Sequence, residues 1–284
     1  MKGSVRSVEE NILHTRKGNI HYWMEIAGSD VPTIVFLPGL TADRHLFDKQ
    51  VHFFLRRYNL IVWDAPGHGS SRPFRLDFSL SDAAKWLHEI LRAEGIARPV
   101  LVGQSMGGYI AQMYMELFPD DVSGFVSIDS APLQRSYMNA LEIAMLRHTS
   151  FFYKLYGWNA LKRTVSRNSA VTPYGRSLML SMLNRYKKDE YVELVAFGYR
   201  ILADAIEQNL PYRIPCPAVL LCGTKDKVGS VKRYNEAWAR KTILTLHRIE
   251  NAGHNANTDA PDVINGIIAE FIETMNEPKR ELLF

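Results

Sequence analysis

The sequence predicts an α/β fold: a doubly wound, mostly parallel sheet of eight strands, flanked by helices, with a helical insertion after the sixth strand. Three observations predict it. Short apolar runs alternate with segments of helical spacing, which is the pattern of parallel sheets covered by helices. Many of the runs end in loops that contain Gly, Pro or Asp. Between Ile128 and Val219 the alternation stops, and helical patterns alone continue.

The first two strands are expected to form a hairpin. Every second residue of 20–26 is apolar, as in a half-buried strand. The turn signal at 17–19 (KGN) separates this segment from the residues of 12–14.

The remaining strands are short apolar runs, as expected for strands buried on both faces. They lie at 33–37, 60–63, 100–102, 125–128, 218–222 and 243–249. Helices are expected between and after them because apolar residues recur there at helical spacing. These helices lie at 46–55, 83–93, from 108 onward, at 231–240 and at 261–275.

The insertion divides the chain into two predicted domains. Residues 1–130 and 212–284 form the sheet-bearing core, and residues 131–211 form a helical cap, or lid, over its active face. The cap segment is rich in aromatic residues and Met. These side chains either line an apolar substrate pocket or pack the cap helices against each other.

Composition excludes several classes of protein. The 284 residues carry a formal charge of +4, too small to indicate nucleic-acid binding. No apolar run is long enough to span a bilayer, and the first 18 residues lack the apolar core of a secretory signal. Only Cys216 and Cys222 are present, so no disulfide framework or zinc site is indicated and a cytoplasmic location is expected.

The positive charge is concentrated in the middle of the chain. Residues 131–213 hold 12 Lys and Arg against 6 Asp and Glu, whereas the rest of the chain is slightly acidic. A charge block of this kind is commonly a solvated helical face. The alternative is that the basic segment attracts an anionic substrate or a membrane surface.

The pentapeptide Gly103-Gln104-Ser105-Met106-Gly107 is the strongest chemical signal. It follows a predicted strand and precedes a predicted helix, which is the setting of a nucleophile elbow. The sharp turn strains the serine backbone, and side chains at 103 and 107 would collide with the crossing chain, so glycine fits there. Ser105 is therefore the predicted nucleophile.

A serine nucleophile needs a general base and a carboxylate that orients this base. His254 lies in the loop NAGHNAN after the last predicted strand and can reach back to the same sheet edge. Two carboxylates follow strands. Asp226 is favoured because the order Ser105, Asp226, His254 then places the acid after the penultimate strand, as is usual for a triad built on a nucleophile elbow. Asp129 is the alternative acid or a local acceptor of backbone N–H groups.

The oxyanion of a tetrahedral intermediate needs hydrogen-bond donors. The backbone N–H of Met106 directly follows the nucleophile. The second donor is expected in the loop after the strand at 33–37, at the N–H of Leu40. The side chains of both residues would then shape the pocket.

The chain resembles α/β-hydrolase-fold enzymes of the large capped group, which includes esterases, lipase-like enzymes and C–C bond hydrolases. The resemblance rests on LPGL at 37–40, DAPGHGSS at 64–71, GQSMGG at 103–108, GTKD at 223–226 and NAGH at 251–254. One departure is Pro38-Gly39, where the family often has His-Gly. The resemblance implies that Asp64 and His68 brace a loop.

The serine also limits the reaction. Haloalkane dehalogenases and epoxide hydrolases of this fold use an aspartate at the elbow, whereas serine suits acyl transfer. The leading hypothesis is hydrolysis of a carboxylic ester of a small, largely apolar substrate through an acyl-enzyme on Ser105. The alternatives are a lactonase, a thioesterase, a C–C bond hydrolase with the same triad, or a ligand-sensing receptor. No cofactor, metal, nucleic acid or stable membrane insertion is expected, and a homodimer is allowed.

Overall fold

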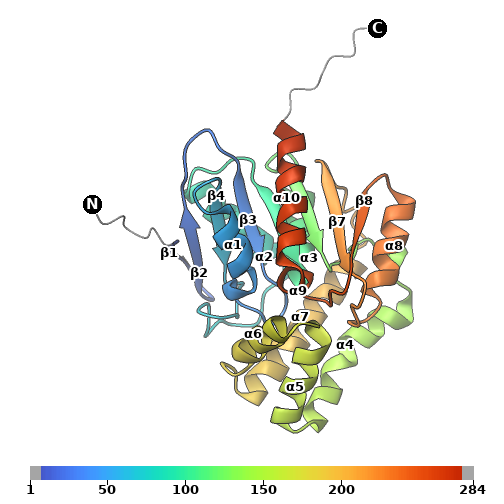
Figure 1. Ribbon diagram of the computed structural model, residues 1–284. Helices are drawn as coiled ribbons and strands as arrows, with labels where there is room; N and C mark the ends of the chain where they lie inside the picture. Colours follow the sequence, from blue (N-terminus) through green and yellow to red (C-terminus); the bar gives the residue numbers. More distant parts are fainter. Residues whose placement is uncertain (1–7, 277–284) are drawn as a thin grey trace.

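The computed structural model describes residues 8–276, except for the side chains of 149–152 and 276. Its centre is an eight-stranded sheet in the order β1-β2-β4-β3-β5-β6-β7-β8 (Figure 1). The strand β2 runs antiparallel to both of its neighbours, and the other neighbouring pairs are parallel. The prediction of a mostly parallel, eight-stranded sheet is confirmed.

The strands follow the predicted runs closely. They are β1 (Glu9–Thr15), β2 (Gly18–Glu25), β3 (Thr33–Leu37), β4 (Asn59–Trp63), β5 (Val100–Gln104), β6 (Gly124–Ile128), β7 (Ala218–Gly223) and β8 (Thr245–Ile249). Every residue of β3, β4, β5 and β6 is buried. Continuous apolar runs occur in these strands because helices cover both faces of the sheet.

Two hydrophobic layers sandwich the sheet. Helices α1 (Asp48–Phe54) and α10 (Pro261–Asn276) cover one face, and α2 (Leu80–Ala93) and α3 (Met106–Leu117) cover the other (Figure 1). The buried side chains of α1 and α10 join one core cluster, and those of α2, α3 and α8 (Val231–Lys241) join the second. This doubly covered sheet holds the strand ends rigidly, and the candidate site is built on those ends.

The chain between β6 and β7 folds into helices. One short 3-10 turn, Arg44–Phe47, follows β3, and a second, Arg135–Tyr137, follows β6. Four longer helices come after the second turn. They are α4 (Ala140–Leu155), α5 (Trp158–Ser169), α6 (Pro173–Leu183) and α7 (Lys188–Glu207). Figure 1 shows these helices gathered at one end of the sheet, beyond the loops that leave β6 and enter β7.

Several boundaries differ from the sequence-based expectation, and two of them have a clear cause. Helix α2 begins at Leu80, three residues earlier than predicted, because Ser79 and Asp82 form a reciprocal capping box. Strand β8 begins at Thr245, and Ile243 is fully exposed, so an apolar residue alone did not mark the strand start.

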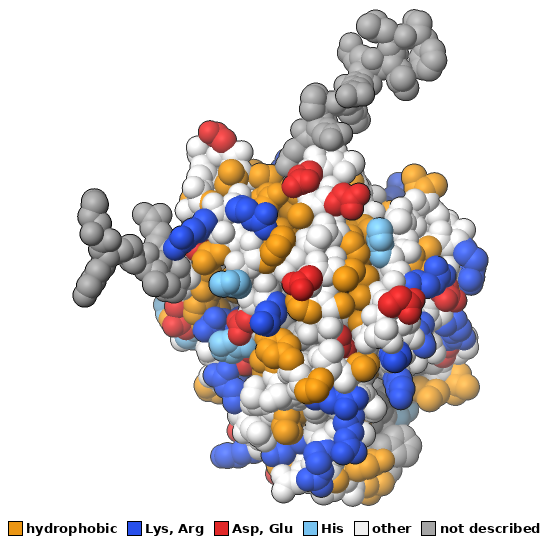
Figure 2. Space-filling model, viewed as in Figure 1, with side chains coloured by type: hydrophobic (Ala, Val, Ile, Leu, Met, Phe, Trp, Pro, Cys, Tyr) orange, Lys and Arg blue, Asp and Glu red, His pale blue; other side chains and the backbone are white. Residues whose placement is uncertain are grey.

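The surface carries its positive charge where the sequence places it. Figure 2 shows many Lys and Arg side chains on the lower part of the molecule in this view. The helices between β6 and β7 occupy that part. Within residues 8–276, no helix is both long enough and apolar enough to cross a bilayer.

Candidate active site

Ser105 lies at the junction between β5 and α3. Its backbone has φ 50° and ψ −115°, a conformation that is strained for a residue with a side chain. The N–H of Ser105 donates to the carbonyl of Ile128 at 2.9 Å, which anchors the turn to β6. The hydroxyl is consequently held above the sheet edge at the start of a helix, as predicted for a nucleophile elbow.

The two glycines of the pentapeptide are required by close backbone contacts. A Cβ at Gly103 would lie 2.5 Å from the backbone nitrogen of Gly108. A Cβ at Gly107 would overlap the carbonyl oxygen of Leu37 on β3. The predicted collision of side chains at these positions with the crossing backbone is therefore confirmed.

His254 lies in the loop between β8 and the short helix α9 (Ala256–Asp259). Its Nε2 is 2.9 Å from Oγ of Ser105, although 149 residues separate the two in the chain. The imidazole is almost completely buried. Nε2 is therefore placed to accept the proton of the serine hydroxyl.

Asp226 lies just beyond β7 and completes a hydrogen-bond chain. Its Oδ2 is 2.9 Å from Nδ1 of His254, and its Oδ1 accepts the N–H of Val228 at 2.7 Å. With Nδ1–H donating to this buried carboxylate, Nε2 is left as the acceptor that faces Ser105. The structure thus brings together the three residues that the sequence selects for a triad.

Asp129, the alternative acid, lies next to Asp226 but faces different partners. Its Oδ1 accepts the N–H of Gly223 at 2.7 Å, and its Oδ2 accepts the N–H of Ala256 at 3.1 Å. Asp129 therefore ties the end of β7 to the loop that carries His254. It acts as the local acceptor of backbone N–H groups that the sequence allowed.

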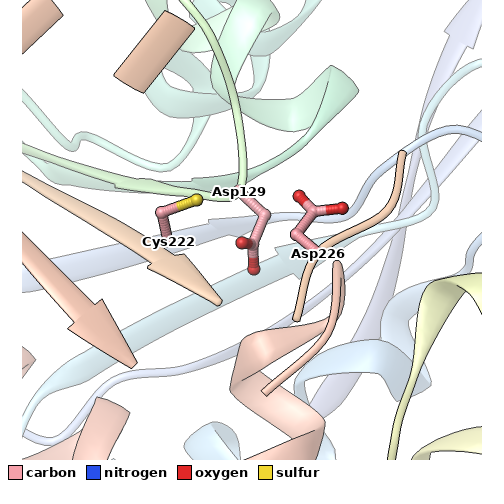
Figure 3. Close-up of side chains that lie close together, drawn as sticks. All are labelled: Asp129, Cys222 and Asp226. Atoms are coloured by element: carbon pink, nitrogen blue, oxygen red, sulfur yellow. The ribbon is translucent and has the colours of Figure 1, made fainter. Parts of the chain in front are cut away.

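Asp129, Cys222 and Asp226 converge closely enough to suggest a metal site (Figure 3). Their candidate ligand atoms lie within 4.8 Å of one another. All four carboxylate oxygens, however, already accept a hydrogen bond from a backbone N–H or from His254. The hydrogen bonds that these oxygens accept account for the convergence of the two carboxylates without an ion.

Burial and the charge of Asp226 shift the pKa of both His254 and Asp129. Burial lowers the pKa of His254, but the charge and hydrogen bond of Asp226 outweigh it, so the net pKa lies above the ordinary value. Burial, together with the nearby charge of Asp226, raises the pKa of Asp129 well above its usual range.

The predicted oxyanion donors lie on either side of Ser105. Within residues 8–276, the N–H groups of Leu40 and Met106 have no hydrogen-bond acceptor. A Cβ at Gly39 would stand 3.1 Å from the Cβ of Ser105, so the loop after β3 lies directly against the nucleophile. The side chain of Leu40 packs on Gly198 of α7, where a side chain would leave no room.

A cavity of about 440 Å³ opens above Ser105 and His254. Its walls come from the core loops and from the helices between β6 and β7. Apolar side chains supply much of the wall: Leu40, Met138, Leu146, Val165, Met179, Val195 and Leu202. The volume and the lining are those of a small-molecule site.

Two further residues position the site and were missed from the sequence. Gln104 donates from Nε2 to the carbonyl of His254 at 2.8 Å, and its place directly before Ser105 was the available signal. Asp259 accepts the N–H groups of Gly253 and Thr172, both at 2.8 Å. No local pattern could reveal this second link, since it joins segments 87 residues apart.

Asp64 and His68 bond to backbone groups of their loops, which fits the bracing role that the resemblance implies. Asp64 accepts the N–H groups of Arg44 and Ser70 at 2.7 and 2.6 Å, which joins the loops after β3 and β4. Nδ1 of the buried His68 lies 3.1 Å from the carbonyl of Pro66.

Known proteins share this architecture. The model of one protein family, described as the alpha/beta hydrolase fold, matches residues 32–261. The chain is 23% identical over 261 residues to monoacylglycerol lipase of Homo sapiens, an alignment that covers 86% of this chain and 76% of that protein. It is 24% identical over 264 residues to (E)-2-((N-methylformamido)methylene)succinate hydrolase of Acinetobacter baylyi, covering 89% and 94%.

A solved structure gives the same result for the fold. A thermophilic esterase from Thermogutta terrifontis superposes with a TM-score of 0.76 at 20% sequence identity. The superposition covers 94% of this chain and 99% of that one.

Proposed function

This chain belongs to the alpha/beta hydrolase family, and we propose that within it the protein is a serine hydrolase that cleaves a carboxylic ester of a small, largely apolar substrate. One observation carries the proposal. An unbroken hydrogen-bond chain runs from Ser105 through His254 to Asp226 at the floor of the cavity. A serine in this arrangement is activated for attack on a carbonyl carbon.

Acylation is the first half of the reaction. His254 Nε2 takes the proton as Ser105 Oγ bonds to the carbonyl carbon, and Asp226 stabilises the imidazolium that forms. The N–H groups of Leu40 and Met106 bind the oxyanion of the tetrahedral intermediate. When the intermediate collapses, the C–O bond to the alcohol breaks, and His254 returns the proton to the leaving alkoxide.

Deacylation uses the same groups in reverse. His254 takes a proton from water as the water oxygen bonds to the acyl carbon of the ester on Ser105. Collapse of the second intermediate breaks the bond to Oγ, which recovers a proton from His254. The products are a carboxylic acid and an alcohol, and the residues return to their starting state.

Residues 131–211 serve in this proposal as the cap that selects the substrate. Their side chains supply much of the apolar cavity wall, and the volume limits the substrate to small or medium-sized esters. Two similar proteins, the human monoacylglycerol lipase and the Thermogutta esterase, carry names of ester hydrolases, which supports the same bond type here.

Turnover of 4-nitrophenyl butyrate tests the proposal. The purified protein is expected to hydrolyse it, and Ser105→Ala is expected to lose at least about 10³-fold in kcat. Ser181→Ala, which removes a hydroxyl from the exposed surface of α6, is the matched control and should retain wild-type rates. A fluorophosphonate should label Ser105, and peptide mass spectrometry can identify the labelled residue.

Two outcomes would redirect the proposal. The protein can be given a dienone substrate that contains a vinylogous diketone group. If it turns this substrate over faster than simple esters, C–C bond hydrolysis at the same serine would be indicated. Tight binding of a small ligand, with no turnover across esters, lactones and thioesters, would indicate a receptor. Both readings predict the same fold, so only the reaction distinguishes them.

A further inference from the structure

Tyrosine hydroxyls line the cavity above Ser105, and they differ in their partners. The hydroxyl of Tyr199 bonds to Tyr153, and that of Tyr234 bonds to Glu142. Among the described residues, the hydroxyl of Tyr109 has no hydrogen-bond partner.

Tyr109 is built into the site at a fixed place. It lies on α3 one turn beyond Ser105, and its N–H contacts the carbonyl of Ser105 at 3.3 Å. Tyr109 and Ser105 both line the same cavity, so the Tyr109 side chain faces the space above the nucleophile. Only 7% of the residue is exposed, and burial raises the pKa of its hydroxyl, which stays protonated as a donor.

Among the described residues, the hydroxyl of Tyr109 is not one of the fully enclosed polar atoms that lack a partner, and Tyr109 lines the cavity. The hydroxyl is therefore open to the cavity space, where a hydrogen bond to a ligand would contribute about 0.5–1.5 kcal/mol. The hydroxyls of Tyr199 and Tyr234 already bond to protein groups. Pockets for small molecules orient their ligands through a few such polar groups set in an apolar wall. The polar residues near Tyr109 extend this pattern, since Glu142, Lys227 and Ser230 also face the cavity.

We propose that Tyr109 is a specificity-determining residue whose hydroxyl bonds to a second oxygen atom of the substrate, close to the scissile carbonyl. This oxygen belongs to a hydroxyl or carbonyl group. The proposal rests on the proposed function, in which Ser105 Oγ bonds to the scissile carbon. It deepens that function by separating oxygenated esters from plain alkyl esters of the same size.

The second oxygen can lie on either side of the ester bond. Three ligands separate the two cases: propyl butyrate, 2,3-dihydroxypropyl butyrate and propyl 3-hydroxybutyrate. The second adds oxygen to the alcohol and the third adds it to the acyl chain. Dissociation constants are measured by calorimetry on Ser105→Ala protein, so that the result does not depend on turnover.

One of the two oxygenated esters is expected to bind roughly three- to tenfold more tightly than propyl butyrate, as one neutral hydrogen bond allows. Adding Tyr109→Phe to Ser105→Ala should abolish this preference. Adding Tyr199→Phe should keep it, because that hydroxyl is already satisfied by Tyr153. Thermal unfolding checks that each variant is folded.

Equal binding of all three esters, or a preference that survives Tyr109→Phe, would overturn the proposal. The Tyr109 hydroxyl would then bond only to water in the cavity. Its failure is distinct from that of the proposed function. Ser105-dependent turnover without an oxygen preference removes only the role of Tyr109. A Tyr109-dependent preference in a protein that turns over no ester removes only ester hydrolysis.

Discussion

Asp129 and Asp226 lie side by side at the ends of two neighbouring strands, but only Asp226 reaches the imidazole of His254. Both oxygens of Asp129 accept backbone N–H groups instead. The two carboxylates therefore divide the work: one orients the base, and the other holds together the two loops that carry the base and its acid. Both residues follow apolar strands, so only the position of Asp226 after the penultimate strand favoured it in the sequence.

The acid assignment predicts unequal effects of two matched substitutions. Asp226→Asn should lower kcat by about 10³–10⁴-fold, because the amide no longer stabilises the imidazolium or fixes its tautomer. Asp129→Asn should lower kcat far less. Its main effect should be a loss of about 1–3 kcal/mol in the free energy of unfolding, since an amide N–H₂ would face a backbone donor.

Steady-state kinetics and urea unfolding on both variants check this prediction. If Asp129→Asn lost more activity than Asp226→Asn while remaining as stable as the wild type, Asp129 would be the catalytic acid.

The pH dependence of kcat/KM follows from the raised pKa of His254. The base works only in its neutral form, so activity should fall as the pH drops through that pKa. The half-maximal point of this acidic limb should therefore lie above the ordinary histidine value of 6.5. In Asp226→Asn the residual activity should show its limb at lower pH, because the charge that raises the pKa is gone.

Rates measured between pH 5 and 9 with one substrate test the sign of this shift. A limb that moved upward in Asp226→Asn would contradict the coupling of the two residues.

The nucleophile elbow predicts a strict requirement for glycine at position 107. Gly107→Ala would bring a Cβ into the carbonyl of Leu37, so the variant should be destabilised by several kcal/mol or fail to fold. Gly266→Ala on α10 is the control, because a Cβ there meets nothing within 4 Å. That variant should gain about 0.5–1 kcal/mol from helix propensity. Thermal melts of both proteins, compared with wild type, decide between these outcomes.

Asp259 predicts a link between the His254 loop and the helices over the site. Asp259→Ala removes the acceptor of the Gly253 and Thr172 N–H groups. We expect a several-fold loss of kcat and a loss of about 1–3 kcal/mol in unfolding free energy. Asp262→Ala, in the first turn of α10, should cost at most about 1 kcal/mol through the helix dipole and leave kcat unchanged. Equal kinetic effects of the two variants would rule out the link.

Much of the fold could be predicted because local patterns carry it. Buried parallel strands need continuous apolar runs, so the six runs from 33–37 onward located six strands. The nucleophile could also be identified, since the strain at Ser105 demands glycine on either side. His254 and Asp226 followed from their places after strands, because parallel strand ends meet at one edge.

The rest could not be predicted because it depends on contacts between distant segments. Nothing local marks Asp259 as the acceptor for residues near 172, or Gly198 as the space into which Leu40 packs. The same limit applies to the cavity. Its aromatic residues were visible in the sequence, but only the folded chain shows that Tyr109 lacks a partner.

His68 predicts how stability depends on pH. Nδ1–H donates to the carbonyl of Pro66, and the buried Nε2 has no partner among the described residues. Burial lowers the pKa of His68 to about 4, so the folded protein keeps the ring neutral where the unfolded chain binds a proton. Stability should therefore fall as the pH drops from about 6.5 to 4, by roughly 3 kcal/mol from this residue. His68→Gln should remove that slope, and the difference between the two unfolding curves isolates it from the carboxylates. A slope that persisted unchanged in the variant would assign the effect to other groups.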